Sequence, residues 1–262
     1  MIWILLQTAA AGLMAWAGWS MRRSHPRLAT AACALLLSLI VLKAVVGHIP
    51  AAEPTLFPWD WYPYVEPWWY LIPAMFLLGA GLQIVWPYRW KRDALLVGAG
   101  LLLARTGAAG WVTTRPHELQ GTVTDAGVCL QTSGYSCGAA AATSFLYYYG
   151  VRVTEQEMAG LCVTRIGGPG LAGTSDAGLM RGLRQKLAGR YSIHIARTPY
   201  EEISTPALVP LEIMPGVGHC VLVWRVDPEL VHLVDPRCGR MTLSRAAFLR
   251  QWAGSAIWAE HE

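Results

Sequence analysis

The chain has 262 residues, of which 54% are hydrophobic and 15% are charged, and its formal net charge is +4. Because soluble globular domains are about 25% charged, this deficit indicates that part of the chain lies in lipid. The Lys and Arg residues are not gathered on one predicted face, which argues against a nucleic-acid partner. No GxxxxGK[ST] motif occurs, so the chain carries no P-loop nucleotide site.

Four apolar runs occupy the first half of the chain: 1–19, 28–49, 69–86 and 94–112. A transmembrane helix needs about 20 predominantly apolar residues, so the first three runs are predicted to span a membrane. The fourth run is the weakest candidate, because Arg105 and four glycines interrupt it. We therefore expect an N-terminal all-α transmembrane bundle of about four helices over residues 1–116.

Charged residues between the runs predict the topology of the chain in a bacterial inner membrane. Basic residues follow the first and third runs, and positive loops stay cytoplasmic; these residues are Arg22, Arg23, Arg27, Arg89, Lys91 and Arg92. The stretch 54–70 lacks Lys and Arg and is rich in Pro and Trp. It suits an outer interfacial aromatic belt or, as the alternative, a substrate-docking surface. The second half is extracytoplasmic if the fourth run spans, and cytoplasmic if that run lies on the surface.

The composition changes at about His117, where turn residues, mixed charges and short strand-like runs begin. Residues 117–262 suffice for one compact domain with its own core. Five of the six cysteines lie in this half, and none forms a CxxC pair, so no metal site and no cofactor is expected. Five thiols suit either one reactive cysteine with two disulfide bridges or five free thiols in a reducing compartment.

Local signals in this half predict its regular elements. A capping box at residues 154–157 begins one helix. Thr174 or Ser175 caps a second helix, which runs to about Leu187. Two further runs are predicted to be strands: 191–196 and 208–213.

Residues 131–150 are the most informative segment. Four consecutive alanines predict a helix over 137–149, with Ser133 or Ser136 as its cap and Gly150 as its stop. Cys137 then lies at the helix N-terminus, where the helix dipole favours a thiolate. Taken alone, the same pattern also fits a buried structural cysteine.

Two β-rich runs, 218–226 and 230–236, flank an Asp-Pro turn and predict a β-hairpin. With Asp227 at the turn centre, His219 and Asp235 are equally distant from it and face each other across the hairpin. A catalytic base and its orienting carboxylate need this arrangement. The alternative is a hairpin with an incidental histidine, but the chain order of cysteine, histidine and acid favours the catalytic interpretation.

Gln131 precedes Cys137 by six residues. Its side-chain amide can donate a hydrogen bond to an oxyanion, together with the backbone N–H of Cys137. This interpretation depends on the neighbouring residues, because a glutamine alone indicates nothing. The sequence thus predicts a four-part catalytic site of Gln131, Cys137, His219 and Asp235.

Five short motifs together resemble the bacteriocin-processing peptidase family: Gln131…Cys137-Gly138, Tyr148-Tyr149-Gly150, Gly173-Thr174-Ser175, Gly218-His219 and Val234-Asp235-Pro236. Members of this family are papain-like cysteine peptidases that remove leader peptides after a double glycine, and many precede an ABC transporter. The resemblance covers about residues 125–255. It implies an α+β papain-like domain with Gln131 in the oxyanion hole, Cys137 as nucleophile, His219 as base and Asp235 as the orienting acid.

The chain departs from the family pattern in three respects. Many members carry Asp immediately before the nucleophile, where this chain has Ser136. The family's peptidase usually leads its chain, whereas this one follows four apolar runs, and no ABC module comes after it. These departures count against transporter-coupled cleavage of leader peptides more than against cysteine-peptidase chemistry.

The sequence therefore predicts a membrane-anchored cysteine endopeptidase. Its expected partners are a peptide or protein substrate with a Gly-Gly leader, the lipid bilayer and a separate ABC transporter. The main alternative is a catalytically silent peptidase-like module that binds leader peptides or a transporter. A second alternative is another thiol chemistry on the same fold, such as acyl transfer to an amine.

Overall fold

The computed structural model describes residues 2–47, 49, 51–66, 69–98, 100, 119–165, 172–214 and 217–262. The chain divides into two compact units. The first unit is formed by Met1–His48 and Tyr64–Thr114, and the second by Ile49–Pro63 and Arg115–Glu262. The stretch between the second and third apolar runs is therefore shared, and its first part folds with the C-terminal half of the chain.

The first unit is helical, with α1 (Ile2–Ser24), α2 (Pro26–Gly47) and α5 (Leu71–Val85) in the places of the first three apolar runs. Helix α1 packs closely against α5. A Cβ added at Gly79 of α5 would come 1.8 Å from the carbonyl oxygen of Ala15, so only glycine permits this approach of the two backbones. Residues 89–98 are also helical.

Helix α2 is the described helix that is long and apolar enough to cross a bilayer. The helix has 22 residues and contains an 18-residue stretch with a mean hydropathy of 2.3. An α-helix of 22 residues extends about 33 Å, the thickness of a hydrocarbon core. Large apolar side chains such as Leu35 and Leu42 are exposed along it. Helix α5 is shorter, with 15 residues. The predicted fourth run, 94–112, lies mostly outside the described residues. Among the described residues the structure supports one spanning helix, and the bundle of about four helices stays a prediction.

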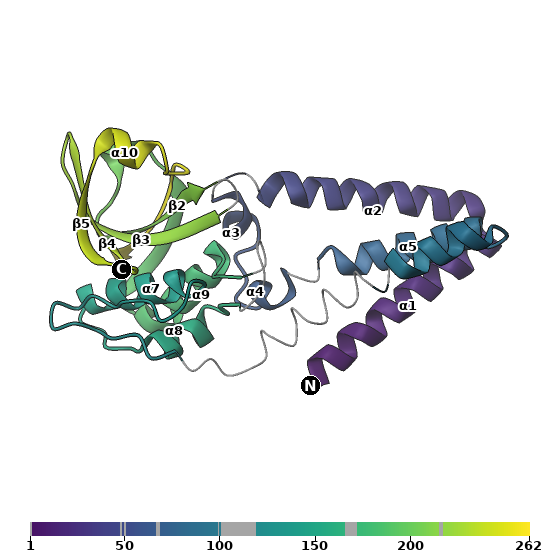
Figure 1. The fold of residues 1–262 in the computed structure, drawn as a ribbon, viewed down its shortest axis with the longest axis horizontal. Helices are drawn as coiled ribbons and strands as arrows, with labels where there is room; N and C mark the ends of the chain where they lie inside the picture. The colour runs from purple at the N-terminus through teal and green to yellow at the C-terminus, as the bar shows by residue number, and fades with distance from the viewer. Residues whose placement is uncertain are drawn as a thin grey trace. The chain divides into compact units, whose positions relative to one another are not determined.

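The second unit is an α+β domain built on one antiparallel sheet (Figure 1). Its six strands follow the order β1-β6-β2-β3-β4-β5. The strands are β1 (Tyr191–Arg197), β2 (Ala207–Met214), β3 (Val217–Val226), β4 (Leu230–Asp235), β5 (Gly239–Ser244) and β6 (Ser255–His261). The helices are α3 (Ala52–Leu56), α7 (Cys137–Tyr148), α8 (Glu155–Leu161), α9 (Asp176–Leu187) and α10 (Arg245–Leu249), with a 3-10 turn η2 (Tyr200–Glu202). Helix α4 (Tyr62–Val65) straddles the boundary at Pro63, where the first segment of this unit ends.

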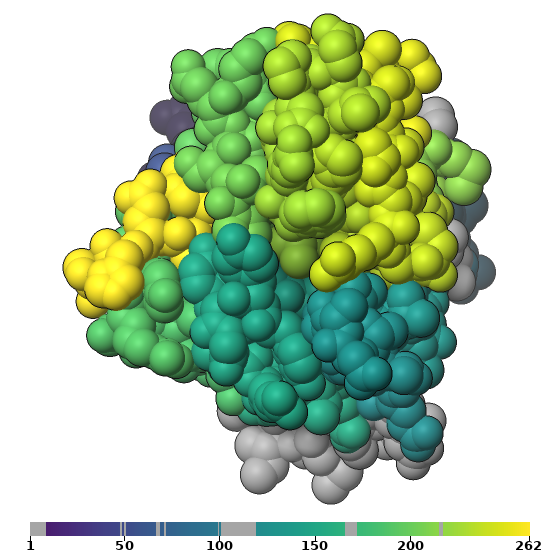
Figure 2. All heavy atoms as spheres, turned by 90° about the vertical axis from the view of Figure 1, so that its left-hand side faces the viewer, coloured from purple at the N-terminus to yellow at the C-terminus, as the bar shows by residue number. Residues whose placement is uncertain are grey.

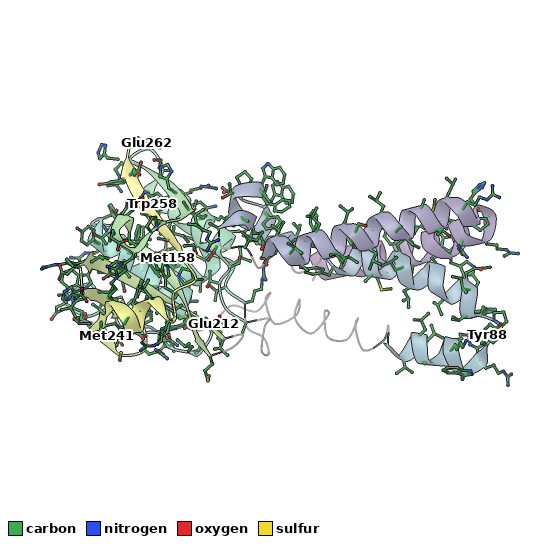
Figure 3. The ribbon with its side chains drawn as sticks, turned by 90° about the horizontal axis from the view of Figure 1, so that it is seen from above. Tyr88, Met158, Glu212, Met241, Trp258 and Glu262 are labelled. Atoms are coloured by element: carbon green, nitrogen blue, oxygen red, sulfur yellow. The ribbon has the colours of Figure 1, made fainter. Side chains whose placement is uncertain are left out.

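Alternation along the strands gives this unit two cores. In β3, Cys220 and Leu222 belong to the core shared with α7, α8 and α9, which includes the fully buried Met158 of α8 (Figure 3). Val221 and Val223 belong instead to the core shared with α10. Successive side chains of a strand point to opposite faces, so the sheet separates α7, α8 and α9 from α10 (Figure 1).

The predicted local elements are confirmed. Helix α7 begins at Cys137, and Gly150 follows its end with a φ of +73°. The Thr154 side chain caps α8 and the Ser175 side chain caps α9. Ser136 occupies the N-cap position of α7, but its hydroxyl donates to the Ser133 carbonyl instead of accepting from the helix. The predicted strands 191–196 and 208–213 lie within β1 and β2.

The hairpin of β3 and β4 has a different register from the predicted one. Val226 pairs with Val231, and the Asp227 N–H donates to the Leu230 carbonyl at 2.8 Å. The turn is therefore centred on residues 228–229, and the prediction that Asp227 is its centre is wrong. The physical reason is that the two-residue loop is a preferred hairpin connection, so pairing continues up to Asp227.

A β-bulge in β3 changes the strand register that this turn sets. The register shifts between Val223 and Arg225, so Trp224 is one extra residue in the strand. With the register set at the turn, His219 and Asp235 would point to opposite faces of the sheet, since a slip of one residue changes the face. The bulge shifts the pairing back by one, so both side chains lie on the same face of the sheet.

Candidate active site

Cys137 is the first residue of α7, and its side chain is partly exposed. The residues around it leave little room. A Cβ on the next residue, Gly138, would come 2.7 Å from the Cβ of Thr174, so glycine is needed for this contact. The Thr174 hydroxyl is in turn hydrogen-bonded to the Thr164 hydroxyl at 2.7 Å. The motif at 173–175 therefore packs beside the start of α7, next to the cysteine.

His219 and Asp235 meet near the ends of β3 and β4. The Nε2 atom of His219 lies 2.8 Å from Oδ1 of Asp235, and both side chains are buried. In the observed register they are diagonal neighbours on one face, a separation that long side chains can bridge. The predicted contact between His219 and Asp235 is thus present. The register that suggested it, with the two residues directly opposite each other, is not present.

The Cys137 thiol differs from the structural thiols of the same unit. Burial raises the pKa of Cys129 and of Cys162 to about 12, and raises that of Cys220 well above its ordinary value. Burial would also raise the pKa of Cys137. Its hydrogen bonds with His219 and with the Cys220 N–H, and the positive charge of His219, instead hold the pKa below the ordinary value. This environment favours a thiolate at Cys137.

The charges of His219 and Asp235 are coupled to that thiolate. Burial alone would lower the pKa of His219, but its bonds to Asp235 and to Cys137 raise the pKa to about 9. Burial alone would raise the pKa of Asp235, but hydrogen bonds from His219 and Arg237 hold the pKa well below its usual range. The arrangement therefore stabilises a thiolate, an imidazolium and a carboxylate in series.

The pH dependence of any reaction at this site follows from these shifts. The rate should rise with pH through the lowered pKa of Cys137, as the thiolate forms, and fall as His219 loses its proton near pH 9. The rising and falling limbs of the pH profile report the titration of the coupled Cys137–His219 pair rather than that of either residue alone. Measurement of kcat/KM against pH checks this expectation. A descending limb near 6.5, the ordinary pKa of histidine, would contradict it.

Gln131 lies on the loop that leads to Cys137. Its backbone N–H donates to the Pro236 carbonyl at 2.8 Å, which fastens this loop beside the end of β4 and Asp235. One side-chain N–H donates to the Ser133 carbonyl at 2.7 Å, and the amide has a second N–H. Its Oε1 is buried without a hydrogen-bond partner among the described residues. The structure thus brings the Gln131 loop to the His219–Asp235 pair.

Sequence reasoning missed a buried carboxylate that holds this loop. Glu155, treated there as part of a capping box, is fully buried. Its carboxylate accepts from the backbone N–H of Thr132 at 3.0 Å and from the Thr132 hydroxyl. Because Thr132 follows Gln131, Glu155 fixes the backbone beside the amide. The pattern of residue types gave no signal for this contact, which joins residues 23 positions apart.

Arg237 is a second residue that sequence reasoning missed. Its Nη2 donates to Oδ2 of Asp235 at 2.7 Å, and its backbone N–H donates to Oδ1 at 2.8 Å. The Nε atom lies 3.2 Å from both carboxylate oxygens. The pKa of the guanidinium is raised chiefly by this contact, and also by the charge of Cys137. Only its position two residues after the predicted acid could have suggested the role.

The substitution Arg237→Gln should move both limbs of the pH profile to higher pH. Removal of a positive charge raises the pKa of every nearby acid, and the half-exposed position of the side chain limits the shift to less than about one pH unit. Arg237→Lys should keep the profile in place, and Arg240→Gln, an exposed arginine on β5, is the matched control. A lower rate with unmoved limbs would show that Arg237 has only a structural role.

A cavity of about 180 Å³ lies elsewhere in this unit. It is lined by residues of the 126–128 loop, the C-terminal part of α7 and strands β3, β4 and β5, including Tyr147, Trp224 and Arg240. These segments meet on the face shown in Figure 2. The four predicted site residues do not line this cavity. In the described part of the chain, no three His, Cys, Asp or Glu side chains come together as a metal site.

All six cysteines are free thiols in the structure. Of the two alternatives that the cysteine count left open, the structure therefore corresponds to free thiols rather than to two bridges. Cys129, Cys162 and Cys220 are buried, whereas Cys238 is exposed. The thiols that can meet a reagent in the second unit are thus Cys137 and Cys238.

Comparisons with known proteins identify the family. The Peptidase C39 family model matches residues 125–262. An uncharacterized protein of Methanothermobacter marburgensis is 29% identical over 150 residues, which cover 55% of this chain and 96% of that protein. An uncharacterized protein of Methanothermobacter thermautotrophicus is 29% identical over 138 residues, 51% of this chain and 87% of that protein.

Two solved structures are also similar to this chain. One is the peptidase domain of Streptococcus ComA, a bifunctional ABC transporter involved in quorum sensing, with 18% identity over 51% of this chain and 96% of that chain and a TM-score of 0.44. The other is a double glycine motif protease from an AMS/PCAT transporter in complex with its leader peptide, with 16% identity over 58% and 97% of the two chains and a TM-score of 0.43.

The family match covers more than half of the chain and includes Cys137, His219 and Asp235. This match confirms the resemblance to bacteriocin-processing peptidases that the sequence motifs indicated. This protein belongs to the Peptidase C39 family of papain-like cysteine peptidases.

Proposed function

We propose that this protein is a membrane-anchored cysteine endopeptidase with Cys137 as nucleophile, His219 as base and Asp235 as the residue that orients the base. The observation that carries the proposal is the buried His219–Asp235 contact of 2.8 Å beside a cysteine whose thiol pKa is lowered by His219. A cysteine that is buried without such a histidine has a raised pKa, as Cys129, Cys162 and Cys220 do.

The reaction begins with attack of the Cys137 thiolate on a peptide carbonyl carbon. The carbonyl oxygen becomes an oxyanion, which accepts hydrogen bonds from the Cys137 backbone N–H and the free N–H of the Gln131 amide. The His219 imidazolium donates its proton to the leaving amine, and a thioester remains on Cys137. His219 then takes a proton from water, the hydroxide attacks the thioester, and the carboxylic acid product and the thiolate are released.

The proposed substrate is a peptide cleaved after a double glycine, as the family membership suggests. A synthetic peptide with an apolar leader ending in Gly-Gly should be cut after the second glycine, and mass spectrometry of the products identifies the bond. A matched peptide with Val in place of the second glycine should be cut much more slowly. Equal cleavage of both peptides would contradict the double-glycine proposal while leaving the peptidase proposal intact.

The alternative function is a silent module that binds leader peptides or a transporter without cutting them. A thiol-reactive peptide probe separates the two, because an activated Cys137 forms a covalent adduct and a silent site does not. Binding of the intact leader peptide with neither product nor adduct would favour the module. Acyl transfer to an amine is distinguished by the product mass, which would include the amine.

Gln131→Ala should lower kcat by about 10²-fold while KM changes little, because an oxyanion donor acts mainly in the transition state. Steady-state kinetics on the double-glycine peptide measure both constants. Gln156→Ala, which removes an exposed amide from α8, is the matched control. An unchanged kcat in the Gln131 variant would remove this residue from the mechanism.

We assign the anchor to residues 1–116 and the peptidase to residues 117–262, with α2 as a membrane-spanning helix. The length of α2, the mean hydropathy of 2.3 over 18 of its residues and its exposed leucines support this assignment. The protein should therefore stay with the membrane pellet after alkaline carbonate extraction. A protein that carbonate releases would contradict the anchor but not the peptidase.

A further inference from the structure

Apolar side chains gather on an exposed surface of the second unit, just after α2 in the chain. Leu56, Trp59 and Trp61 are between 49% and 55% exposed, and we call these three residues the tryptophan patch. The rings of Trp59 and Trp61 stack with their centroids 5.2 Å apart. Large apolar groups exposed together indicate a surface that another phase or molecule covers.

The tryptophan patch belongs to the peptidase domain rather than to a loose connection. Arg165 donates to the Pro63 carbonyl at 2.9 Å, and Arg184 of α9 donates to the Pro58 carbonyl at 3.0 Å. Helix α3 packs against α9. Tyr62 is fully buried, and its hydroxyl is hydrogen-bonded to Glu53. These contacts tie residues on both sides of the patch to the domain that carries the candidate active site.

The position of the patch directly after α2 in the chain indicates what covers it. Helix α2 ends at Gly47, and the second unit starts at Ile49. If α2 crosses a bilayer, the following residues emerge at the membrane interface, where Trp is the preferred side chain. No Lys or Arg occurs between Lys43 and Arg89, so within this segment the aromatic side chains rather than positive charges provide the contact, and zwitterionic headgroups suffice for it.

The charges at the other end of α2 specify the side of the membrane. Arg22, Arg23 and Arg27 lie at the turn between α1 and α2. Positive segments of this kind remain in the cytoplasm, so the C-terminal end of α2 is extracytoplasmic. Because residues 49–63 fold with the peptidase domain, the domain must share the side on which those residues emerge.

We propose that the tryptophan patch docks the peptidase domain on the zwitterionic outer surface of the membrane and that Cys137 acts outside the cytoplasm. This inference rests on the proposed membrane anchor. Because the domain shares the side of residues 49–63, the chain between Pro63 and Leu119 must cross the membrane an even number of times, and the predicted third and fourth apolar runs, 69–86 and 94–112, are the candidates for such a pair. The substrate is then a peptide that has already been exported, or the outer segment of a membrane protein.

Lipid crosslinking of the full chain tests the docking. The protein is placed in nanodiscs of phosphatidylcholine that carries a photoactivatable group, irradiated and mapped by mass spectrometry. Adducts are expected on α2 and on the patch. The double variant Trp59→Ser, Trp61→Ser should lose the patch adducts and keep those on α2. Trp224→Ser, which removes an exposed tryptophan from β3, is the control and should change neither.

The outcomes separate this inference from the anchor on which it rests. Absence of adducts on α2 would contradict the anchor itself. Adducts on α2 without any on the patch would overturn the docking alone. Crosslinks from the patch to a protein in native membranes, in place of lipid, would also overturn it, because the patch would then be a protein-binding surface.

Thiol labelling in spheroplasts tests the membrane side. A membrane-impermeant maleimide should label the exposed Cys238 of the Cys137→Ala variant before permeabilisation. Ser24→Cys, placed at the turn between α1 and α2 in a Cys137→Ala, Cys238→Ser background, should be labelled only after permeabilisation. The reverse pattern would overturn the assignment of the side while leaving the anchor in place.

Discussion

Replacing Cys137 with alanine is expected to abolish peptide cleavage while the protein stays folded. The thiolate forms the bond to the substrate carbonyl, and the pKa of Cys137 is lowered whereas burial raises the pKa of Cys129, Cys162 and Cys220. The loss in kcat/KM should be at least about 10⁴-fold, since removal of a nucleophile disables the whole triad. Cleavage of the double-glycine peptide, followed by mass spectrometry, measures it.

The stability of this variant should change by about 1 kcal/mol or less, because Ala is smaller, favours helices and replaces a partly exposed residue at the start of α7. Thermal unfolding checks that the fold is retained. Cys238→Ser is the matched control, because it removes the other accessible thiol of this unit. Undiminished cleavage by the Cys137 variant would refute the peptidase assignment.

Replacing His219 with alanine should cause a loss of similar size, about 10⁴-fold in kcat/KM. The variant loses the general acid that protonates the leaving amine, and the thiol loses the hydrogen bond and positive charge that lower its pKa. Asp235 keeps its contacts with Arg237, so the buried carboxylate is not left unpaired and the domain should remain folded.

The thiol itself reports this change independently of catalysis. In a Cys238→Ser background, the rate of iodoacetamide alkylation should follow the titration of Cys137, and the midpoint should rise when His219 is removed. His232→Ala is the matched control, because His232 pairs with Asp227 at 2.9 Å in the same hairpin but has no part in the site. An unmoved alkylation midpoint in the His219 variant would show that the histidine does not activate the thiol.

The sequence predicted the elements of the second unit well because their signals are local. An Ala-rich stretch ending in Gly150 defines α7, and hydroxyl caps at Thr154 and Ser175 define the starts of α8 and α9. The placement of Cys137 at a helix N-terminus follows from the same local pattern. Such features depend on neighbours within one turn, so residue type and spacing suffice to predict them.

Contacts between distant segments could not be predicted in this way. The hydrogen bonds from Thr132 to Glu155 and from Gln131 to Pro236 join segments whose sequences carry no sign of each other. The stretch 54–70 was predicted as a membrane-facing belt or docking surface, but its attachment to α9 is visible only in the folded chain. These contacts depend on which surfaces packing brings together, and single-sequence patterns do not contain that information.

The sequence by itself determined that a cysteine at a helix start and a histidine and an aspartate on one hairpin would be available in this chain. Only the tertiary structure decided that the histidine and aspartate share a face. The turn at residues 228–229 sets a register that would separate His219 from Asp235, and the extra residue Trp224 restores it. The physical reason is that strand side chains alternate with a period of two, so one unpaired residue decides whether two distant groups meet.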